Sequence, residues 1–156
     1  MPYTSLLRGR TSLNGHYYVV TTATAHRHPL FASLVAGRVI LNTLRAQDAA
    51  GHTQTLACVV MPDHVHWLVR LVGSQSLSAV VRHVKGRSAH DLNARAQGAG
   101  PVWQKGFHDH AVRSDQSLEA IARYVIENPI RAGIVSCIGD YSLWHCAWEL
   151  PWALSG

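Results

Sequence analysis

The sequence is poor in cysteine and in acidic residues, and it has no long apolar run. Its 156 residues include three cysteines without a Cys-x-x-Cys spacing, which argues against both a disulfide framework and a thiolate metal site. The N-terminal stretch MPYTSLLRGR lacks the apolar core of a signal peptide, and no apolar run approaches the roughly 18 residues that cross a bilayer. We therefore expect reduced thiols and a cytoplasmic location.

Internal repeats, low-complexity tracts and composition breaks are also missing from the sequence, so nothing in it marks a linker. Apolar residues make up 47% of the chain, enough to bury a core without metal or disulfide cross-links. We expect residues 1–156 to form one domain.

Basic residues outnumber acidic ones. The chain carries 14 Lys and Arg against 9 Asp and Glu, a formal net charge of +5, and twelve of the cations are arginine. The planar guanidinium matches phosphate oxygens bidentately, so this composition favours a polyanionic partner such as nucleic acid. An arginine bias on an ordinary solvated surface would explain the same charge, so composition alone does not choose between them.

Hydrophobic periodicity predicts an α+β fold. The pattern predicts a strand at 16–25, a helix at 29–47, a hairpin of 55–61 and 65–72, a helix at 77–96, a strand at 107–113 and a helix at 118–127. This order implies a ferredoxin-like or RNA-recognition-like sandwich, a mostly antiparallel sheet of four or five strands with helices on one face.

Local signals set the expected boundaries of these elements. The Pro62-Asp63 pair can reverse the chain within the hairpin, and Ser76 can cap the helix that follows it. Either Ser114 or Asp115 is expected to cap the last long helix, and the Asn128-Pro129 step should end it, with a short turn restarting there. The apolar stripe of the 29–47 helix includes Leu34 and Val35. No pattern places the aromatic tail at 141–152.

Three His-x-His pairs stand in the sequence, at 26/28, 64/66 and 108/110. On a strand, residues two apart project to the same face, so two imidazoles can converge on one metal ion. His64 and His66 flank an apolar residue, Val65, at the start of a hydrophobic strand, which suits a metal site; two polar residues on a solvent-facing strand are the alternative. The 26/28 pair lies in a loop. For the 108/110 pair we expect a substrate-contacting or supporting role.

Tyr124 supplies a candidate nucleophile. It lies four residues before Asn128, so the two side chains can share one helix face, with Glu127 as a competing carboxylate. The alternative interpretations are a core or interface aromatic for Tyr124 and, for Asn128, the cap of the next helical turn.

Three motifs occur in order along most of the chain: MPDHVHWLV, WQKGFHDHAVR and RYVIENPIRAG. Together they resemble the REP-associated tyrosine transposases, a branch of the IS200-like single-strand transposases in the HUH superfamily. The resemblance implies that His64 and His66 are metal ligands, that Tyr124 attacks DNA and that Asn128 takes the position of a third ligand. It also implies an antiparallel α+β fold.

The chemistry implied is metal-dependent DNA cleavage. A divalent ion, Mg²⁺ or Mn²⁺, held by nitrogen and oxygen ligands would polarise a phosphate, and Tyr124 would form a 5′-phosphotyrosyl intermediate that a 3′-hydroxyl can reverse. The family recognises hairpins of repetitive extragenic palindromes in single-stranded DNA. The protein could act as a monomer or as a homodimer.

Candidate contacts to the DNA are basic and aromatic side chains. The expected phosphate contacts are Arg82, Lys85, Arg87, Arg123 and Arg131, and the expected stacking aromatics are Trp67 or Trp103. Three alternatives stay open: a replication initiator or relaxase of the same superfamily, a non-catalytic nucleic-acid-binding module on this fold, and a zinc hydrolase that uses His64, His66 and a third histidine.

Overall fold

A hairpin of two long apolar strands forms the middle of the structure, a computed structural model that describes residues 16–148. Strand β2 (Thr53–Met61) pairs with β3 (His64–Leu71), and the two-residue turn at 62–63 joins them, as the sequence predicts. The register places Met61 opposite His64 and Val60 opposite Val65. Val60 is fully buried, so this register is held by packing as well as by hydrogen bonds.

Three further strands complete an antiparallel sheet. They are β1 (Tyr17–Ala23), β4 (His108–Ala111) and β5 (Trp144–Cys146), and the strand order is β4-β1-β3-β2-β5. Every neighbouring pair is antiparallel. The predicted α+β class and antiparallel sheet are thereby confirmed.

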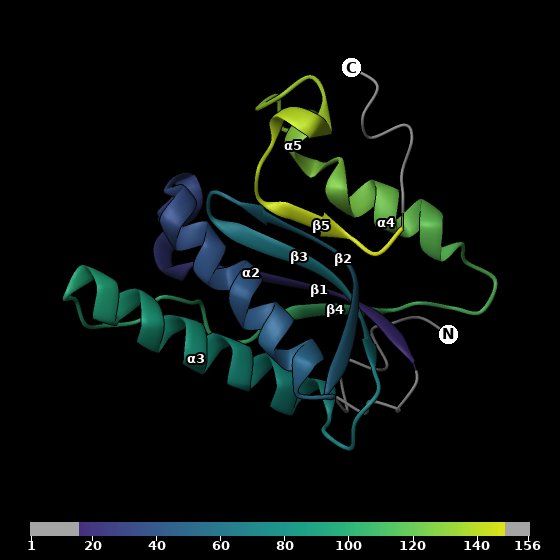
Figure 1. The fold of residues 1–156 in the computed structure, drawn as a ribbon, viewed down its shortest axis with the longest axis horizontal. Helices are drawn as coiled ribbons and strands as arrows, with labels where there is room; N and C mark the ends of the chain where they lie inside the picture. The colour runs from purple at the N-terminus through teal and green to yellow at the C-terminus, as the bar shows by residue number, and fades with distance from the viewer. Residues whose placement is uncertain (1–15, 149–156) are drawn as a thin grey trace.

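The helices lie on both faces of this sheet (Figure 1). Helices α2 (Leu34–Ala49) and α3 (Leu77–Ala96) cover one face, as expected. Helix α4 (Leu118–Ile126), followed by the short α5 (Asn128–Arg131), packs on the other face, against β2, β3 and β5. The expectation of helices on one face is therefore wrong for α4.

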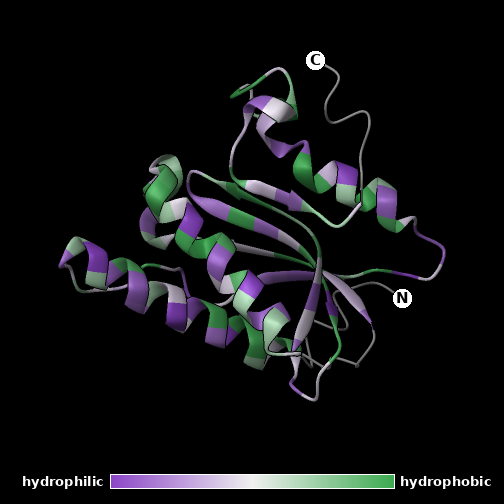
Figure 2. Cartoon of the chain, in the orientation of Figure 1, coloured by the Kyte–Doolittle hydropathy of each residue, from purple (hydrophilic) through white to green (hydrophobic). Residues whose placement is uncertain are grey.

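Side-chain alternation along the strands divides the interior into two cores. On the α2/α3 side the sheet contributes Tyr18, Val20, Val65, Trp67 and Val69. On the α4 side it contributes Ala57, Val59, Met61 and Leu68. Hydrophobic and hydrophilic residues alternate in bands along α2, α3 and α4, as expected of helices with one buried side (Figure 2). Both faces of β2 and β3 are thus buried, which explains their nearly continuous apolar sequences.

Two helix starts differ from the sequence expectation. Helix α2 begins only after Ser33, whose Oγ accepts from the Ala36 amide at 3.3 Å, and a 3₁₀ turn at 30–32 precedes it. Leu34 and Val35 are consequently 47% and 56% exposed and lie outside the core. In α4 the cap is Ser117 rather than Ser114 or Asp115, since a turn at 113–116 intervenes before the helix.

The segment that follows α5 packs along the β2 edge of the sheet. Tyr141 donates its hydroxyl proton to the Val60 carbonyl at 2.5 Å, and β5 then pairs with β2. The part of the predicted aromatic tail beyond residue 148 lies outside the described residues. Across residues 16–148, no helix combines the length and apolarity that a bilayer crossing demands.

Thiol reactivity tests the central position of β2. Burial raises the pKa of Cys58 to about 12, and its side chain is 2% exposed, whereas Cys137 is only half-buried. Because the thiolate is the reactive form, iodoacetamide at mildly alkaline pH should modify Cys137 much faster than Cys58 in the folded protein. Mass spectrometry of the labelled peptides measures both rates. Equal labelling of the two thiols without denaturant would contradict the position of β2 between β3 and β5.

Candidate active site

Two histidines of β3 lie side by side on the sheet face that α4 partly covers. Val65 between them is 3% exposed and points into the α2/α3 core, which directs His64 and His66 to the opposite face. Their ring centroids are 4.8 Å apart and the rings are nearly perpendicular, at 88°. The expectation that one strand presents both imidazoles on one face agrees with this geometry.

Each imidazole is oriented through its Nδ1 atom. His64 Nδ1 donates to Asp63 Oδ1 at 2.7 Å, and His66 Nδ1 is hydrogen-bonded to Thr21 Oγ1 on β1 at 3.0 Å. Asp63 in turn accepts from Arg27 Nε at 3.0 Å. These bonds leave Nε2 of each ring for a ligand, the arrangement in which a carboxylate or hydroxyl behind a histidine orients it toward a metal.

The charge state of His66 suits a ligand role. Burial, together with the neighbouring His64, lowers the pKa of His66 to about 4, so this ring is neutral at physiological pH. Arg131 and Arg27 act in the same direction. Burial alone would raise the pKa of Asp63, but the hydrogen bond from His64 and the charge of Arg27 outweigh it and lower that pKa. An ionised carboxylate therefore stands behind His64, next to a neutral His66 ring.

Tyr124 projects from α4 on the same side of the sheet. The buried residues of α4 are Ala122, Val125 and Ile126, and they fix the helix on β2 and β3. Tyr124 lies on the other side of the helix and is 66% exposed, so it is not the core aromatic that its periodicity allows.

Arg131 connects this tyrosine with the histidine pair. Its guanidinium carbon lies 3.8 Å from the centroid of the Tyr124 ring, and its Nη2 donates to the Tyr124 carbonyl at 2.5 Å. The same positive charge acts on His66. The restart of the helix at Asn128-Pro129 makes this contact possible, because α5 turns the chain back toward the end of α4.

Asn128 lies where α4 gives way to α5. Its Nδ2 donates to the Val125 carbonyl at 2.8 Å, at the end of α4, and its oxygen keeps its acceptor capacity. The alternative interpretation, a cap of the next helical turn, is wrong, because the N-cap position of α5 is Glu127. Between residues 16 and 148, no group of three or more His, Cys, Asp or Glu side chains could hold a metal ion. A metal at the histidine pair would need oxygen ligands of another kind.

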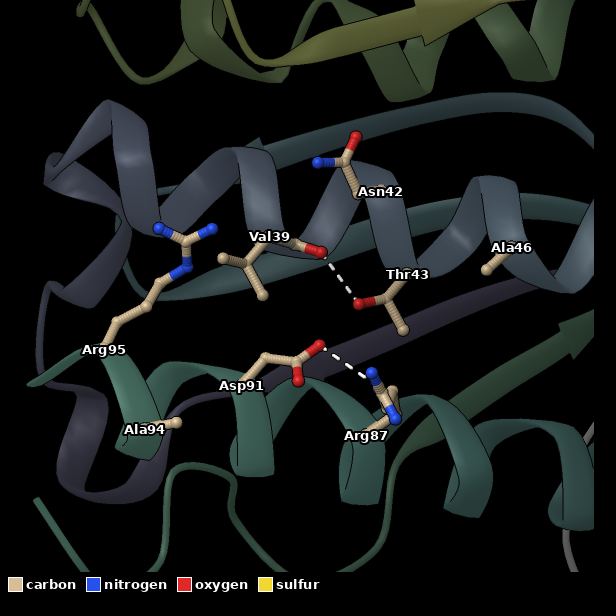
Figure 3. Close-up of a pocket in the computed structure, with 8 residues that line it drawn as sticks. All are labelled: Val39, Asn42, Thr43, Ala46, Arg87, Asp91, Ala94 and Arg95. Atoms are coloured by element: carbon tan, nitrogen blue, oxygen red, sulfur yellow. Dashed lines mark hydrogen bonds and ion pairs between the residues drawn. The ribbon is translucent and has the colours of Figure 1, made fainter. Parts of the chain in front are cut away.

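Three of the five predicted phosphate contacts lie away from this site. Arg82, Lys85 and Arg87 are on α3, across the sheet from the histidine pair. Arg87 pairs with Asp91 at 3.2 Å and lines a groove of about 600 Å³ between α2 and α3 (Figure 3). Lys85 donates to the carbonyls of Gln104 and Gly106 at 2.6 and 2.7 Å. Its ammonium therefore holds a loop instead of facing solvent freely.

The other two predicted contacts are on the side of the sheet that carries the histidines. Arg131 stacks on Tyr124, as described above, and Arg123 Nε lies 3.3 Å from Glu127 Oε1 on α4. Glu127 is thus engaged in an ion pair, which weakens its standing as a rival to Asn128 for a ligand role.

The expectation that Trp67 or Trp103 stacks on bases is wrong. They are 3% and 8% exposed, and each indole N–H is hydrogen-bonded inside the α2/α3 core, to Thr55 and Ser88 respectively. Alternation explains the first case, since Trp67 directly follows His66 and therefore faces the other side of β3.

The other two His-x-His pairs differ in position. His26 and His28 form an edge-to-face pair at 6.0 Å on the exposed 25–28 loop. His108 lies opposite Thr21 in the β1/β4 register, on the same sheet face as His66. The intervening Asp109 is 3% exposed on the opposite face, so its charge does not prevent this arrangement.

Sequence reasoning missed the residues that orient the imidazoles. Asp63 could have been found, because it directly precedes His64. Thr21 and Arg27 stand 45 and 36 residues from their partners, His66 and Asp63, and only the pairing of β1 with β3 brings them there.

The sequence of this chain is similar to those of known transposases. Residues 12–128 match the family model described as "Transposase IS200 like". Two curated relatives, whose descriptions both include the words REP-associated tyrosine transposase, come from Haemophilus influenzae and Escherichia coli. They are 27% identical over 104 residues and 30% identical over 86 residues.

The aligned stretches cover only part of these relatives. The match takes in 59% of this chain and 59% of the Haemophilus protein, and 54% of this chain and 49% of the Escherichia protein. A solved structure of a REP-associated tyrosine transposase bound to a REP hairpin superimposes with a TM-score of 0.68. That match covers 86% of this chain and 78% of that one at 23% identity, which shows the shared fold.

The stacking of Arg131 on Tyr124 can be tested by NMR. A guanidinium 3.8 Å above an aromatic ring lies in the ring current, so the side-chain protons of Arg131 should resonate upfield of ordinary arginine values. Tyr124→Leu should remove this shift and leave the signals of Arg123 nearly unchanged. Arg131 signals at ordinary positions in the unsubstituted protein would contradict the stack.

Proposed function

This chain belongs to the family of IS200-like transposases, and from that membership we propose that it is a metal-dependent tyrosine transposase that cuts and rejoins single-stranded DNA. One observation carries the proposal: the histidine pair and Tyr124 lie on the same side of the sheet. Arg131 stacks on the Tyr124 ring, and its charge helps to lower the pKa of His66. The DNA would be a hairpin, by analogy with the relative bound to a REP hairpin.

The nucleophile is Tyr124. A phenol holds its proton at neutral pH, so attack requires that the proton be removed as the bond to phosphorus forms. The exposed position of the ring lets an extended strand approach its hydroxyl, while the Arg131 guanidinium on the ring face limits its orientations. Arg131 also places a positive charge near the phosphate that would be attacked, which favours the charge that develops there.

The proposed step conserves the energy of the broken bond. A bond forms between Tyr124 Oη and phosphorus, and the bond from phosphorus to the 3′-oxygen breaks; the 3′-oxygen takes up a proton and leaves as a hydroxyl. The product is a 5′-phosphotyrosyl enzyme. Attack by a 3′-hydroxyl on this ester restores the phenol and joins two strands, so no nucleotide cofactor is needed.

The residues present fit a divalent metal. His64 and His66 would hold it through Nε2, since Nδ1 of each ring is already hydrogen-bonded, and the Asn128 amide oxygen is the proposed third ligand. A bound Mg²⁺ or Mn²⁺ would act as a Lewis acid on the phosphate oxygens. The chain itself supplies the two imidazoles, with the Asp63 carboxylate behind His64 and the Thr21 hydroxyl behind His66.

Substitution of Tyr124 tests the nucleophile. Tyr124→Phe should abolish the covalent adduct with a hairpin-bearing single-stranded oligonucleotide in Mn²⁺ and leave the binding affinity nearly unchanged, because only the hydroxyl is removed. A denaturing gel detects the adduct. The matched control is Tyr17→Phe, which removes the hydroxyl of another tyrosine that lies near a guanidinium, that of Arg70 at 5.8 Å. An adduct that persists in Tyr124→Phe would remove Tyr124 from the mechanism.

Metal binding tests the histidine pair. Asp63→Ala removes the carboxylate that orients His64, so Mn²⁺ affinity measured by calorimetry should fall roughly 10- to 100-fold. Asp91→Ala, which removes an ion-paired carboxylate on the other side of the sheet, should leave the affinity unchanged.

Chelation by EDTA should also stop adduct formation without preventing DNA binding. Equal Mn²⁺ affinities for the two variants would contradict the metal site. DNA binding without any metal-dependent adduct would favour the non-catalytic module instead.

A further inference from the structure

A second concave site lies beside the histidine pair. It is a pocket of about 240 Å³ between Thr21 and Ala23 of β1 and the loop and strand residues 104–108, with Arg27 on a further side. Helix α4 makes its main contacts with β2, β3 and β5, so the pocket lies to the side of the strands on which α4 chiefly packs. Its β1 residues, Thr21 and Ala23, lie opposite His66 and His64 in the β1/β3 register.

The walls of the pocket are firmly held. Lys85 reaches across from α3 and donates to the carbonyls of Gln104 and Gly106, and the Gln104 amide donates to Ala23 at 2.9 Å. Gly106 has a φ of +75°, which a residue with a Cβ adopts only with strain. The 104–106 loop is thus fastened on both sides, and a preformed pocket loses little entropy when a ligand binds.

The side of the pocket formed by Arg27 is held under strain. His26 and Arg27 have φ values of 56° and 55°, in a region that residues other than glycine rarely occupy. Hydrogen bonds from Thr24 to the Asp63 and His28 carbonyls fix this turn in place. They hold the Arg27 guanidinium against Asp63, with only its Nε engaged in that bond.

The lining of the pocket is positively charged. Arg27, Lys105 and His108 supply cations or potential cations, and none of the described residues that line it is acidic. Lys105 and His108 are exposed to solvent. This composition fits an anion, and the planar Arg27 fork and the Lys105 ammonium are typical phosphate contacts.

Two residues of the pocket are also those that orient the imidazoles. Thr21 is hydrogen-bonded to His66, and Arg27 pairs with Asp63, which orients His64. His108 lies two strands from His66 in the sheet, roughly 10 Å away. A strand of DNA held at the histidine pair and running toward β4 would pass over the pocket.

We propose that this pocket binds the phosphate and sugar of the nucleotide next to the scissile phosphate, with Lys105 and His108 contacting the phosphate and Arg27 positioning it. The inference rests on the proposed function, since it assigns a subsite to the same DNA. The pocket is smaller than the roughly 300–1,000 Å³ of typical small-molecule sites, so it accepts one nucleotide unit and not a duplex. The substrate must therefore be single-stranded at this position.

Binding measurements without chemistry test the subsite. The parent is Tyr124→Phe in EDTA, so neither the adduct nor the metal contributes, and the probe is a fluorescein-labelled oligothymidylate followed by anisotropy. Lys105→Ala combined with His108→Ala should weaken binding about tenfold. The slope of log affinity against log salt concentration should become shallower by about 0.7 for each phosphate that the variant no longer neutralises. The matched control is Arg45→Ala, an exposed cation on α2 across the sheet, which should leave both quantities unchanged.

A second readout locates the bound nucleotide. On titration of the parent with the oligothymidylate, the amide signals of Gly106 and Phe107 should shift, and these shifts should disappear in the double variant. Affinity and salt slope of the double variant equal to those of Arg45→Ala would overturn the subsite, and so would the absence of any measurable binding by the parent. Failure of the proposed function would give a different result. The unsubstituted protein would bind the oligothymidylate through the pocket but would form no covalent adduct with the hairpin-bearing oligonucleotide in Mn²⁺.

Discussion

The alternation of side chains along β3 is the constraint on which the rest of the site depends. Burial of Val65, Trp67 and Val69 against α2 and α3 leaves His64 and His66 no choice but the other face. A shift of one residue in the register would turn both imidazoles into the α2/α3 core and move these three apolar side chains out of it. The free energy that stabilises the α2/α3 core therefore also fixes the direction of the histidine pair.

Helix α4 uses the same face only in part. Among the described residues its main strand contacts are with β2, β3 and β5, so the histidine pair lies toward the border of the region on which α4 packs. This position explains why His66 is buried enough to be neutral. Its Nδ1 is hydrogen-bonded to Thr21, which leaves Nε2 for a ligand. This position also explains how Tyr124, on the outer side of α4, can be exposed within an otherwise well-packed element.

The arginines and lysines of the chain make different kinds of contact, which composition alone does not reveal. Arg131 stacks on Tyr124, Arg27 holds Asp63, and Lys85 fastens a loop by two carbonyl contacts. Each of these charges stabilises the geometry of the face on which the histidines lie. A net charge of +5 therefore describes structural contacts as well as affinity for a polyanion.

The sequence by itself determined whatever depends on short-range order. The Pro62-Asp63 turn, the shared face of His64 and His66, the Ser76 cap and the helix break at Asn128-Pro129 follow from local backbone preferences and from the two-residue period of a strand. The motifs around these positions were also enough to indicate the family.

The tertiary structure alone decided which elements meet. The side of the sheet taken by α4, the pairing of β5 with β2, the burial of Trp103 and the Thr21–His66 bond all join residues far apart in the chain. Periodicity states which residues of an element share a face, but it does not state what covers that face. Such contacts are fixed by the packing of the whole chain, in which many weak interactions compete and only their sum selects one arrangement.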